Sequence, residues 1–143
     1  MTIHAVIDTN VLVSSMLTKN KKAATARLIE ALFDNIFRPV YNNDIIDEYN
    51  EVLSRKEFHF DTDVIDALIN TLKNNGLYAD RTPSDEPVID PKDVVFYEVA
   101  LSKEGAYLVT GNLRHFPQKP IVVTPAEMIQ ILEDNGLIEK EEI

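Results

Sequence analysis

Short apolar runs alternate with amphipathic stretches along the chain. Residues 3–7, 106–109 and 121–123 are short, mostly apolar runs of the kind found in strands buried on both faces of a sheet. Residues 36–41 predict a further strand, in which Pro39 indicates an edge position or a bulge, because proline cannot donate to a ladder. Strands this apolar must be covered, so the segments between them should supply helices.

The segments between these strands carry apolar residues at helical spacing. Helices are predicted at residues 23–34, 43–55, 62–75, 91–103 and 125–135. The last of them begins with a capping box, formed by Thr124 at the N-cap and Glu127 at N3, with Pro125 at N1. Gly76 is expected at the C′ position of the helix 62–75. Residues 77–82 follow as a strand or an extended connection.

This alternation predicts βαβ units and therefore an α/β three-layer sandwich, with a mainly parallel central sheet flanked by helices. The 143 residues fit a single domain, residues 1–143. In such sheets ligands bind beyond the carboxyl ends of the strands. Functional side chains are therefore expected just after strands.

Composition excludes several classes of protein. The chain has no cysteine, which excludes disulfides and thiolate metal sites. It shows neither a signal-peptide pattern nor an apolar run of about 18 residues, so we expect a cytoplasmic protein without membrane association. Fourteen basic residues against 24 acidic ones give a net charge of −10, which argues against broad, nonspecific binding to nucleic acid.

Two polar side chains follow buried strands. Asp8 comes directly after residues 3–7, and Asn112 comes shortly after residues 106–109. A lone carboxylate at the end of a buried strand would carry a large desolvation cost, which favours a ligand role for Asp8, with a helix N-cap as the alternative. Asn112 could offer an uncharged amide to a ligand, or simply complete a turn.

Further acids lie on predicted helices. Glu48 falls at the edge of the buried stripe of residues 43–55, so its carboxylate can reach over the sheet edge; a solvated flank is the alternative. Asp93 lies in the first turn of residues 91–103 on the apolar face, which suits a ligand. Asp90 is best explained as the cap of that helix and only secondarily as a contributor to a site.

Together these positions predict a metal site. Asp8, Glu48 and Asp93 would repel one another if the fold brings them into one partly dry cleft, and a bound cation offsets that cost. Hard divalent cations take oxygen ligands of this kind. The sequence shows no paired histidine spacing, no Ser-His or Cys-His arrangement and no glycine-rich phosphate loop.

The order and spacing of these positions resemble the PIN-domain (PilT N-terminus-like) nuclease family, and most closely its branch of toxin components of toxin-antitoxin pairs. The resemblance extends from Val6 to about Val123. It is carried by residues 6–12, 47–53, 90–93 and 107–112. Each segment alone is unspecific, but their order and spacing together are fairly specific.

The resemblance implies a PIN-like fold, Mg²⁺ or Mn²⁺ as cofactor, and hydrolysis of RNA phosphodiesters by an endoribonuclease. It implies Asp8 and Asp93 as catalytic metal ligands, Glu48 as a ligand or water-orienting group, and Asn112 as a neutral ligand or phosphate contact. The supporting polar groups would be Thr9, Asn10, Asp90 and Thr110. The family usually has a fourth acid where this chain has Asn112, a departure that should weaken a second metal before the first.

Partners follow from the same resemblance. RNA is the expected substrate, and its phosphates would contact Lys19, Lys21, Lys22, Arg114 and His115, unless these form ordinary solvated surface. A toxin role implies an antitoxin protein that masks the cleft. Relatives also pair as homodimers, for which Tyr49, Phe58 and Phe60 are candidate contact residues, with core positions as the alternative.

Two other functions stay open at the level of sequence. With Asn112 in place of an acid, the chain could be a catalytically weakened PIN-like module that binds RNA or a protein. It could also be a phosphohydrolase with Asp8 as covalent nucleophile. Against the second stands Asn10, which leaves no carboxylate two positions on to act as acid and base.

Overall fold

A parallel sheet of five short strands lies at the centre of the computed structural model, which describes residues 2–140. The strands are β1 (His4–Ile7), β2 (Arg38–Tyr41), β3 (Leu77–Tyr78), β4 (Tyr107–Val109) and β5 (Val122–Val123), in the spatial order β3-β2-β1-β4-β5. Each strand runs parallel to its neighbours. The prediction of an α/β sandwich around a mainly parallel sheet is confirmed.

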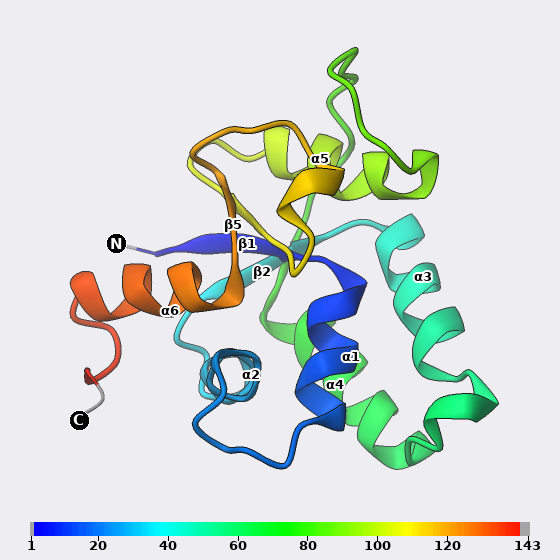
Figure 1. Cartoon of the computed structure of the whole chain (residues 1–143), viewed down its shortest axis with the longest axis vertical. Coiled ribbons are helices and arrows are strands. Elements are labelled where there is room, and N and C mark those ends of the chain that lie inside the picture. Colours follow the sequence, from blue (N-terminus) through cyan, green and yellow to red (C-terminus); the bar gives the residue numbers. More distant parts are fainter. Residues whose placement is uncertain (1, 141–143) are drawn as a thin grey trace.

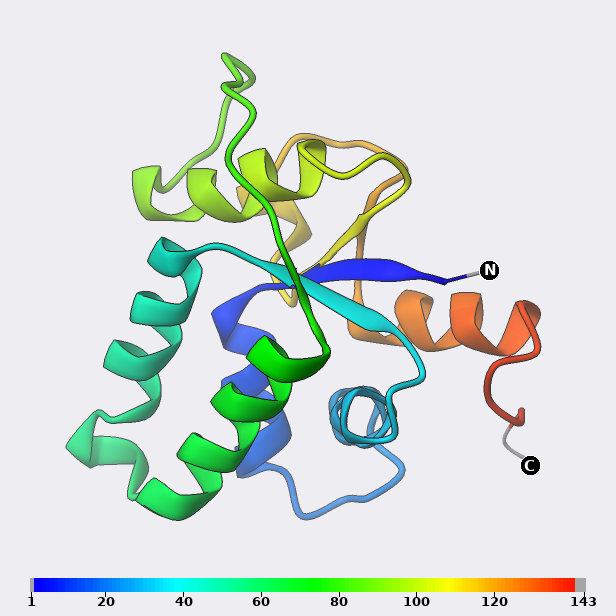
Figure 2. The ribbon, with the colours of Figure 1, turned by 180° about the vertical axis from the view of Figure 1, so that it is seen from behind.

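Helices cover both faces of this sheet. They are α1 (Thr9–Leu17), α2 (Ala24–Phe33), α3 (Asn43–Leu53), α4 (Thr62–Asn75), α5 (Val94–Leu101) and α6 (Pro125–Asp134), with the 3-10 turns η1 (Lys56–Phe58), η2 (Pro91–Asp93) and η3 (Leu113–His115). In Figure 1, α5 lies on one side of the sheet and α1, α2, α4 and α6 lie on the other, and Figure 2 shows the same layers from behind. None of the helices within residues 2–140 is long and apolar enough to cross a lipid bilayer.

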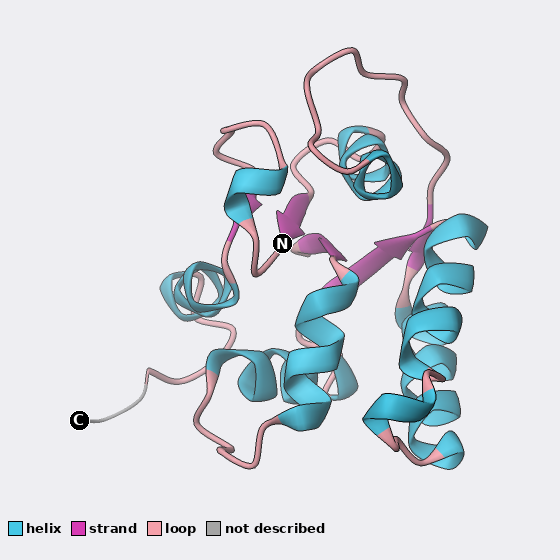
Figure 3. Ribbon diagram, turned by 45° about the vertical axis from the view of Figure 1, so that its right-hand side comes forward, coloured by secondary structure: helices cyan, strands magenta, loops and turns pink. Residues whose placement is uncertain are grey.

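Helix α3 has a separate place. It begins at the carboxyl end of β2 and packs against α1, α4 and α5. Figure 3 shows the strands with helices on either side. Helix α3 therefore stands beside the edge of the sheet where parallel strands end. Asn42 caps it by accepting a hydrogen bond from the backbone N–H of Ile45 at 2.9 Å, as expected for asparagine at an N-cap.

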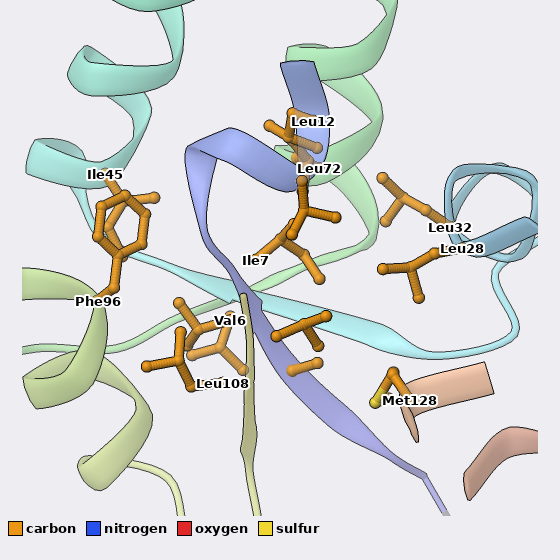
Figure 4. Packing of buried hydrophobic residues seen from close by; sticks show 14 of the residues in the cluster. Val6, Ile7, Leu12, Leu28, Leu32, Ile45, Leu72, Phe96, Leu108 and Met128 are labelled. Atoms are coloured by element: carbon orange, nitrogen blue, oxygen red, sulfur yellow. The ribbon is translucent and has the colours of Figure 1, made fainter. Parts of the chain in front are cut away.

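Strand β1 is held in the middle of the hydrophobic core. Figure 4 shows Ile7 close to Leu12 and Leu72, whereas Val6 and Leu108 lie on the side of Phe96 and α5. The exposed fraction of each of these side chains is at most 1%. Because these side chains are almost completely buried, β1 is held in place and the chain leaves the strand in one direction.

The register of β1 and β4 brings their ends together. Ile7 is opposite Val109 in the ladder, and the backbone N–H of Asp8 donates to the carbonyl oxygen of Val109 at 2.9 Å. The segments that follow the two strands therefore start side by side, although about 100 residues separate them in the sequence.

Helix α1 was not predicted. Its Thr, Val and Ser residues have modest helix propensity, so no helical pattern stands out in residues 9–17. Packing against α2 and α3 stabilises the helix, and Val11 and Leu12 are buried in the core. Because α1 begins at Thr9, Asp8 occupies its N-cap position, yet its side chain makes no capping hydrogen bond.

Two local predictions were wrong. Strand β2 is interior, between β1 and β3, and its Pro39 is tolerated because β3 pairs only from Val40 onward. Gly76 directly follows α4 but is its C-cap and not the C′ residue, with an extended backbone (φ −93°). A Cβ at that residue would lie 2.2 Å from the backbone oxygen of Leu72, so close approach of the backbone explains the glycine. The other predicted strands and helices are confirmed to within a few residues.

Candidate active site

A cleft of about 380 Å³ opens at the carboxyl edge of the sheet, where β1 and β4 end. It is lined by Asp8, Thr9, Asn10, Val13, Ser14, Glu48, Val52, Phe58, Asp90, Asp93, Asn112 and His115. The structure thus brings Asp8, Glu48, Asp93 and Asn112 to one place from four separate segments of the chain. A parallel sheet produces this convergence because all its strands end at the same edge.

Asp8 is the most buried of these acids, with an exposed fraction of 5%. Its Oδ2 accepts hydrogen bonds from the hydroxyl of Thr110 at 2.8 Å and from the amide of Asn10 at 3.2 Å. Thr110 itself is fully buried. These two hydrogen bonds hold the carboxylate of Asp8 in place at the carboxyl edge of the sheet, and they do not neutralise its charge.

Glu48 reaches the cleft from the second turn of α3. The hydroxyl of Thr9 donates to its Oε2 at 2.5 Å, which ties α3 to the first residue of α1. The phenol of the next residue, Tyr49, donates to the carbonyl oxygen of Ile7 at 2.5 Å. Tyr49 is 1% exposed and belongs to the hydrophobic core, which was the alternative considered for it.

The turn after β4 completes one wall. The backbone N–H of Gly111 donates to Oδ1 of Asn10 at 3.1 Å, and that of Asn112 donates to the hydroxyl of Thr110 at 3.0 Å. Asn10 therefore contacts both Asp8 and this turn. The segments after β1 and β4 are joined by side-chain hydrogen bonds and hold the carboxylate of Asp8 between them.

Asp93 faces the cleft from the last residue of η2. Its Oδ2 lies 3.3 Å from Nδ1 of His115, an ion pair when the imidazole is protonated. Asp90 is the cap of η2, since its Oδ1 accepts from the backbone N–H of Lys92 at 3.0 Å. Asp90 also lines the cleft, so both roles considered for it are compatible with the structure.

Burial, together with nearby like charges, raises the pKa values of the acids in the cleft. Burial, reinforced by the charges of Asp93 and Glu48 and offset in part by Thr110, raises the pKa of Asp8 to about 6. Burial also raises the pKa of Glu48 and that of Asp93, against the hydrogen bonds from Thr9 and His115. Each of these three carboxyl groups therefore ionises less readily in the folded protein than it would in water.

The basic residues predicted to contact phosphates do not gather at the cleft. Lys19, Lys21 and Lys22 are exposed and follow the far end of α1, about 14 Å of helix away from Asp8. His115 lines the cleft, whereas Arg114 lines a neighbouring cavity. Contact between these side chains and RNA stays a prediction.

Sequence reasoning missed several residues that line the cleft. Ser14 lies one helical turn after Asn10 and would have been found had α1 been recognised, because residues four apart share a helix face. Phe58 is half-buried in η1 and stacks on Phe60 with ring centroids 5.2 Å apart. No local pattern signals that Phe58 reaches the cleft. Whether these two phenylalanines contact a second copy of the chain stays a prediction.

Comparison with known families agrees with this geometry. A family model for the PIN domain matches residues 4–114, which include all four converging positions. The chain belongs to the PIN domain family. PIN domains are generally nucleases and typically depend on a divalent metal. Membership of the family therefore supports a hydrolase function in general. No curated protein and no solved structure gives a significant match.

The donors in the cleft of this PIN domain fit a hard divalent cation, because carboxylate and amide oxygens are its preferred ligands. Within residues 2–140, no three His, Asp or Glu side chains lie close enough to enclose an ion by themselves. Mg²⁺ is usually held by only one or two carboxylates, while water and substrate phosphates complete its shell. A cleft lined by Asp8 and Asp93 matches that mode of binding.

Proposed function

We propose that this PIN domain is a metal-dependent endoribonuclease that hydrolyses RNA phosphodiesters at the cleft. The observation that supports the proposal most directly is the convergence of Asp8, Glu48 and Asp93, each with a raised pKa, on one cleft. Three mutually repelling acids reduce the stability of the metal-free fold. A function that requires a cation at this place explains why they are together.

Each side chain of the cleft has a distinct task in this proposal. Asp8 and Asp93 hold Mg²⁺ or Mn²⁺, which when bound polarises the scissile phosphate and activates water. Glu48, fixed by the hydroxyl of Thr9, orients the attacking water and accepts its proton, a task for which a raised pKa is suited. Asn112 donates its amide N–H to a phosphate oxygen. Thr110 holds Asp8 in position.

The function is tested by incubating the purified chain with labelled RNA and Mn²⁺, beside an Asp8→Asn variant. We expect the wild type alone to cleave the RNA. Cleavage should stop on addition of EDTA and resume when Mn²⁺ is supplied in excess. If both proteins cleave equally, the activity belongs to a contaminant and the proposal fails.

Thr110→Val tests how the buried acid is positioned. Valine has nearly the shape of threonine but lacks the hydroxyl that donates to Asp8 and accepts from the backbone of Asn112. We expect about a tenfold loss of Mn²⁺ affinity and of cleavage rate, because groups that orient a ligand typically contribute this much. Thr110→Ser, which keeps the hydroxyl, should restore most of both; a valine variant with unchanged metal affinity would contradict the assigned role.

We further propose that the nuclease is the toxin of a toxin-antitoxin pair, with an antitoxin protein covering the cleft. The resemblance of its segments to that branch of the family supports this role, as does a cleft open enough to admit a partner's side chain. Induced expression in a bacterial host should arrest growth for the wild type and not for Asp8→Asn. Normal growth at equal levels of both proteins would argue against a toxin.

The two alternative functions are less well supported. A weakened binding module is favoured only by the neutral Asn112, and it predicts RNA binding without cleavage in the assay above. A phosphohydrolase with Asp8 as nucleophile would need a carboxylate two positions after Asp8 to act as acid and base. That position is occupied by Asn10, whose amide donates to Asp8 and accepts from the backbone of Gly111 and cannot act as an acid.

A further inference from the structure

A second cavity, of about 480 Å³, shares η3 as a wall with the cleft. Asn112 and His115 line the cleft, whereas Leu113 and Phe116 line the second cavity. Residues three apart lie on the same side of a 3-10 turn, so this one turn directs each pair to a different cavity. A chain molecule bound in the cleft can therefore reach the second cavity by passing over a single turn of backbone.

The floor of the second cavity is apolar. It consists of Leu113, Phe116, Pro117 and Val122, from η3, the following connection and the edge strand β5. Leu113 is 42% exposed, so its apolar surface is accessible to a ligand in the cavity. Apolar walls of this kind favour a ligand with a flat, weakly hydrated face.

The rim of the same cavity is polar and basic. Lys119 is already paired, with its Nζ 2.8 Å from Oε1 of Glu86. Arg114 is exposed, and no acidic side chain of residues 2–140 lies within ion-pair distance of it. Gln118 is exposed beside it and carries both a hydrogen-bond acceptor and two donors. The rim thus offers a guanidinium for an anion and an amide for a polar ring edge.

We propose that this cavity is a nucleobase subsite, which holds the base of the nucleotide next to the scissile phosphate. The base lies on the apolar floor of Leu113 and Phe116, Gln118 hydrogen-bonds to its edge, and Arg114 binds its phosphate. The inference rests on the proposed ribonuclease function, because it assigns a neighbouring nucleotide of that substrate. The proposed subsite would select the base of the RNA, whereas the contacts proposed for the cleft involve only the RNA backbone.

The chemistry of the cavity favours a nucleotide over a protein segment. A single nucleotide carries an aromatic face, a polar edge and a negative charge close together. The three features match the floor, Gln118 and Arg114 in turn. The shared wall at η3 also places the cavity within one turn of Asn112, the proposed phosphate contact.

The subsite is tested by NMR titration of the full, isotope-labelled chain with each of the four ribonucleoside monophosphates in EDTA. At least one of them should shift the amide signals of Leu113, Phe116, Gln118 and Val122. Ribose 5-phosphate, which lacks a base, should leave the signals of Phe116 and Val122 unchanged. Equal shifts with ribose 5-phosphate would reduce the site to simple anion binding and overturn the proposal.

Substitutions on the exposed rim give a second measurement. Gln118→Ala and Arg114→Ala should each weaken binding of the preferred nucleotide about five- to tenfold, the latter more strongly at low salt. Gln130→Ala and Arg38→Ala, which change exposed residues outside this cavity, are the matched controls and should have no effect. Equal affinity in all four variants would overturn the subsite.

Three further outcomes separate this proposal from its alternatives. Binding of an apolar dye such as anilinonaphthalene sulfonate, with no binding of any nucleotide, would make the cavity a protein-docking surface and overturn the subsite. The titration needs neither metal nor RNA cleavage. If the chain binds nucleotides in the cavity but cleaves no RNA, the subsite proposal stands and the nuclease proposal fails. If the chain cleaves RNA but nucleotides shift none of these signals, only the subsite proposal fails.

Discussion

Asp8→Asn is expected to abolish RNA cleavage and, at the same time, to make the metal-free protein more stable. Asparagine keeps an oxygen that can accept from Thr110 and Asn10, so the local hydrogen bonds survive. What is lost is the negative charge needed to hold a cation. We expect the cleavage rate to fall about a thousandfold or more, as when a central electrostatic group is removed from an active site.

The gain in stability follows from the raised pKa of Asp8. A carboxyl group with a folded-state pKa of about 6 binds a proton more tightly in the folded than in the unfolded chain. Its contribution therefore favours folding at low pH and is lost as pH rises through about 6. Above that pH, ionisation of Asp8 lowers the free energy of unfolding by about 3 kcal/mol, and the asparagine variant does not undergo this loss.

Urea denaturation in EDTA measures this effect. The variant should be more stable than the wild type at pH 7.5, and the difference should become small near pH 4, where Asp8 is protonated. Asp66→Asn, which alters an exposed acid on α4, is the matched control and should show no comparable gain. A less stable asparagine variant at pH 7.5, or one that retains cleavage, would contradict the role assigned to Asp8.

Asn112→Asp is expected to increase metal affinity about ten- to hundredfold, by restoring the fourth acid that the family usually has at this place. Asn112 lines the cleft together with Asp8 and Asp93, and its side chain is exposed, so an added carboxylate finds room and water. The new charge should favour a second ion in particular. We expect cleavage to require less Mn²⁺ and the metal-free fold to become less stable.

Isothermal titration with Mn²⁺ gives the number of ions bound and their affinities. Asn112→Ser removes the amide without adding charge and should not bind the metal more tightly than the wild type. Asn20→Asp adds the same charge in the exposed connection between α1 and α2 and controls for net charge. Unchanged affinity in Asn112→Asp would show that residue 112 does not face the ion.

Most of the fold could be predicted because its signals are local. The run at residues 3–7 and the capping box at Thr124 each act within a few residues and are found where the sequence indicates them. Elements stabilised by distant contacts were harder to predict. Helix α1 depends on burial of Val11 and Leu12 against other helices, and the place of Pro39 depends on where the short strand β3 begins.

The same division applies to the cleft. Asp8 and Asn112 could be assigned to one edge of the sheet, because both follow parallel strands. The inward position of Glu48 followed from the apolar stripe of its helix. Their partners could not be inferred: the hydrogen bond from Thr9 to Glu48 and the contact between Asp93 and His115 join segments 39 and 22 residues apart. Nothing in either segment alone specifies the other.

The sequence by itself determined the type of each element, the class of fold and the acids that carry the proposed chemistry. Periodicity, caps and strand ends are properties of neighbouring residues, which a single sequence displays directly. Only the tertiary structure decided how β1 and β4 are aligned, how deeply Asp8 is buried and that η3 separates two cavities. These features depend on packing between distant segments, whose free energy no local pattern contains.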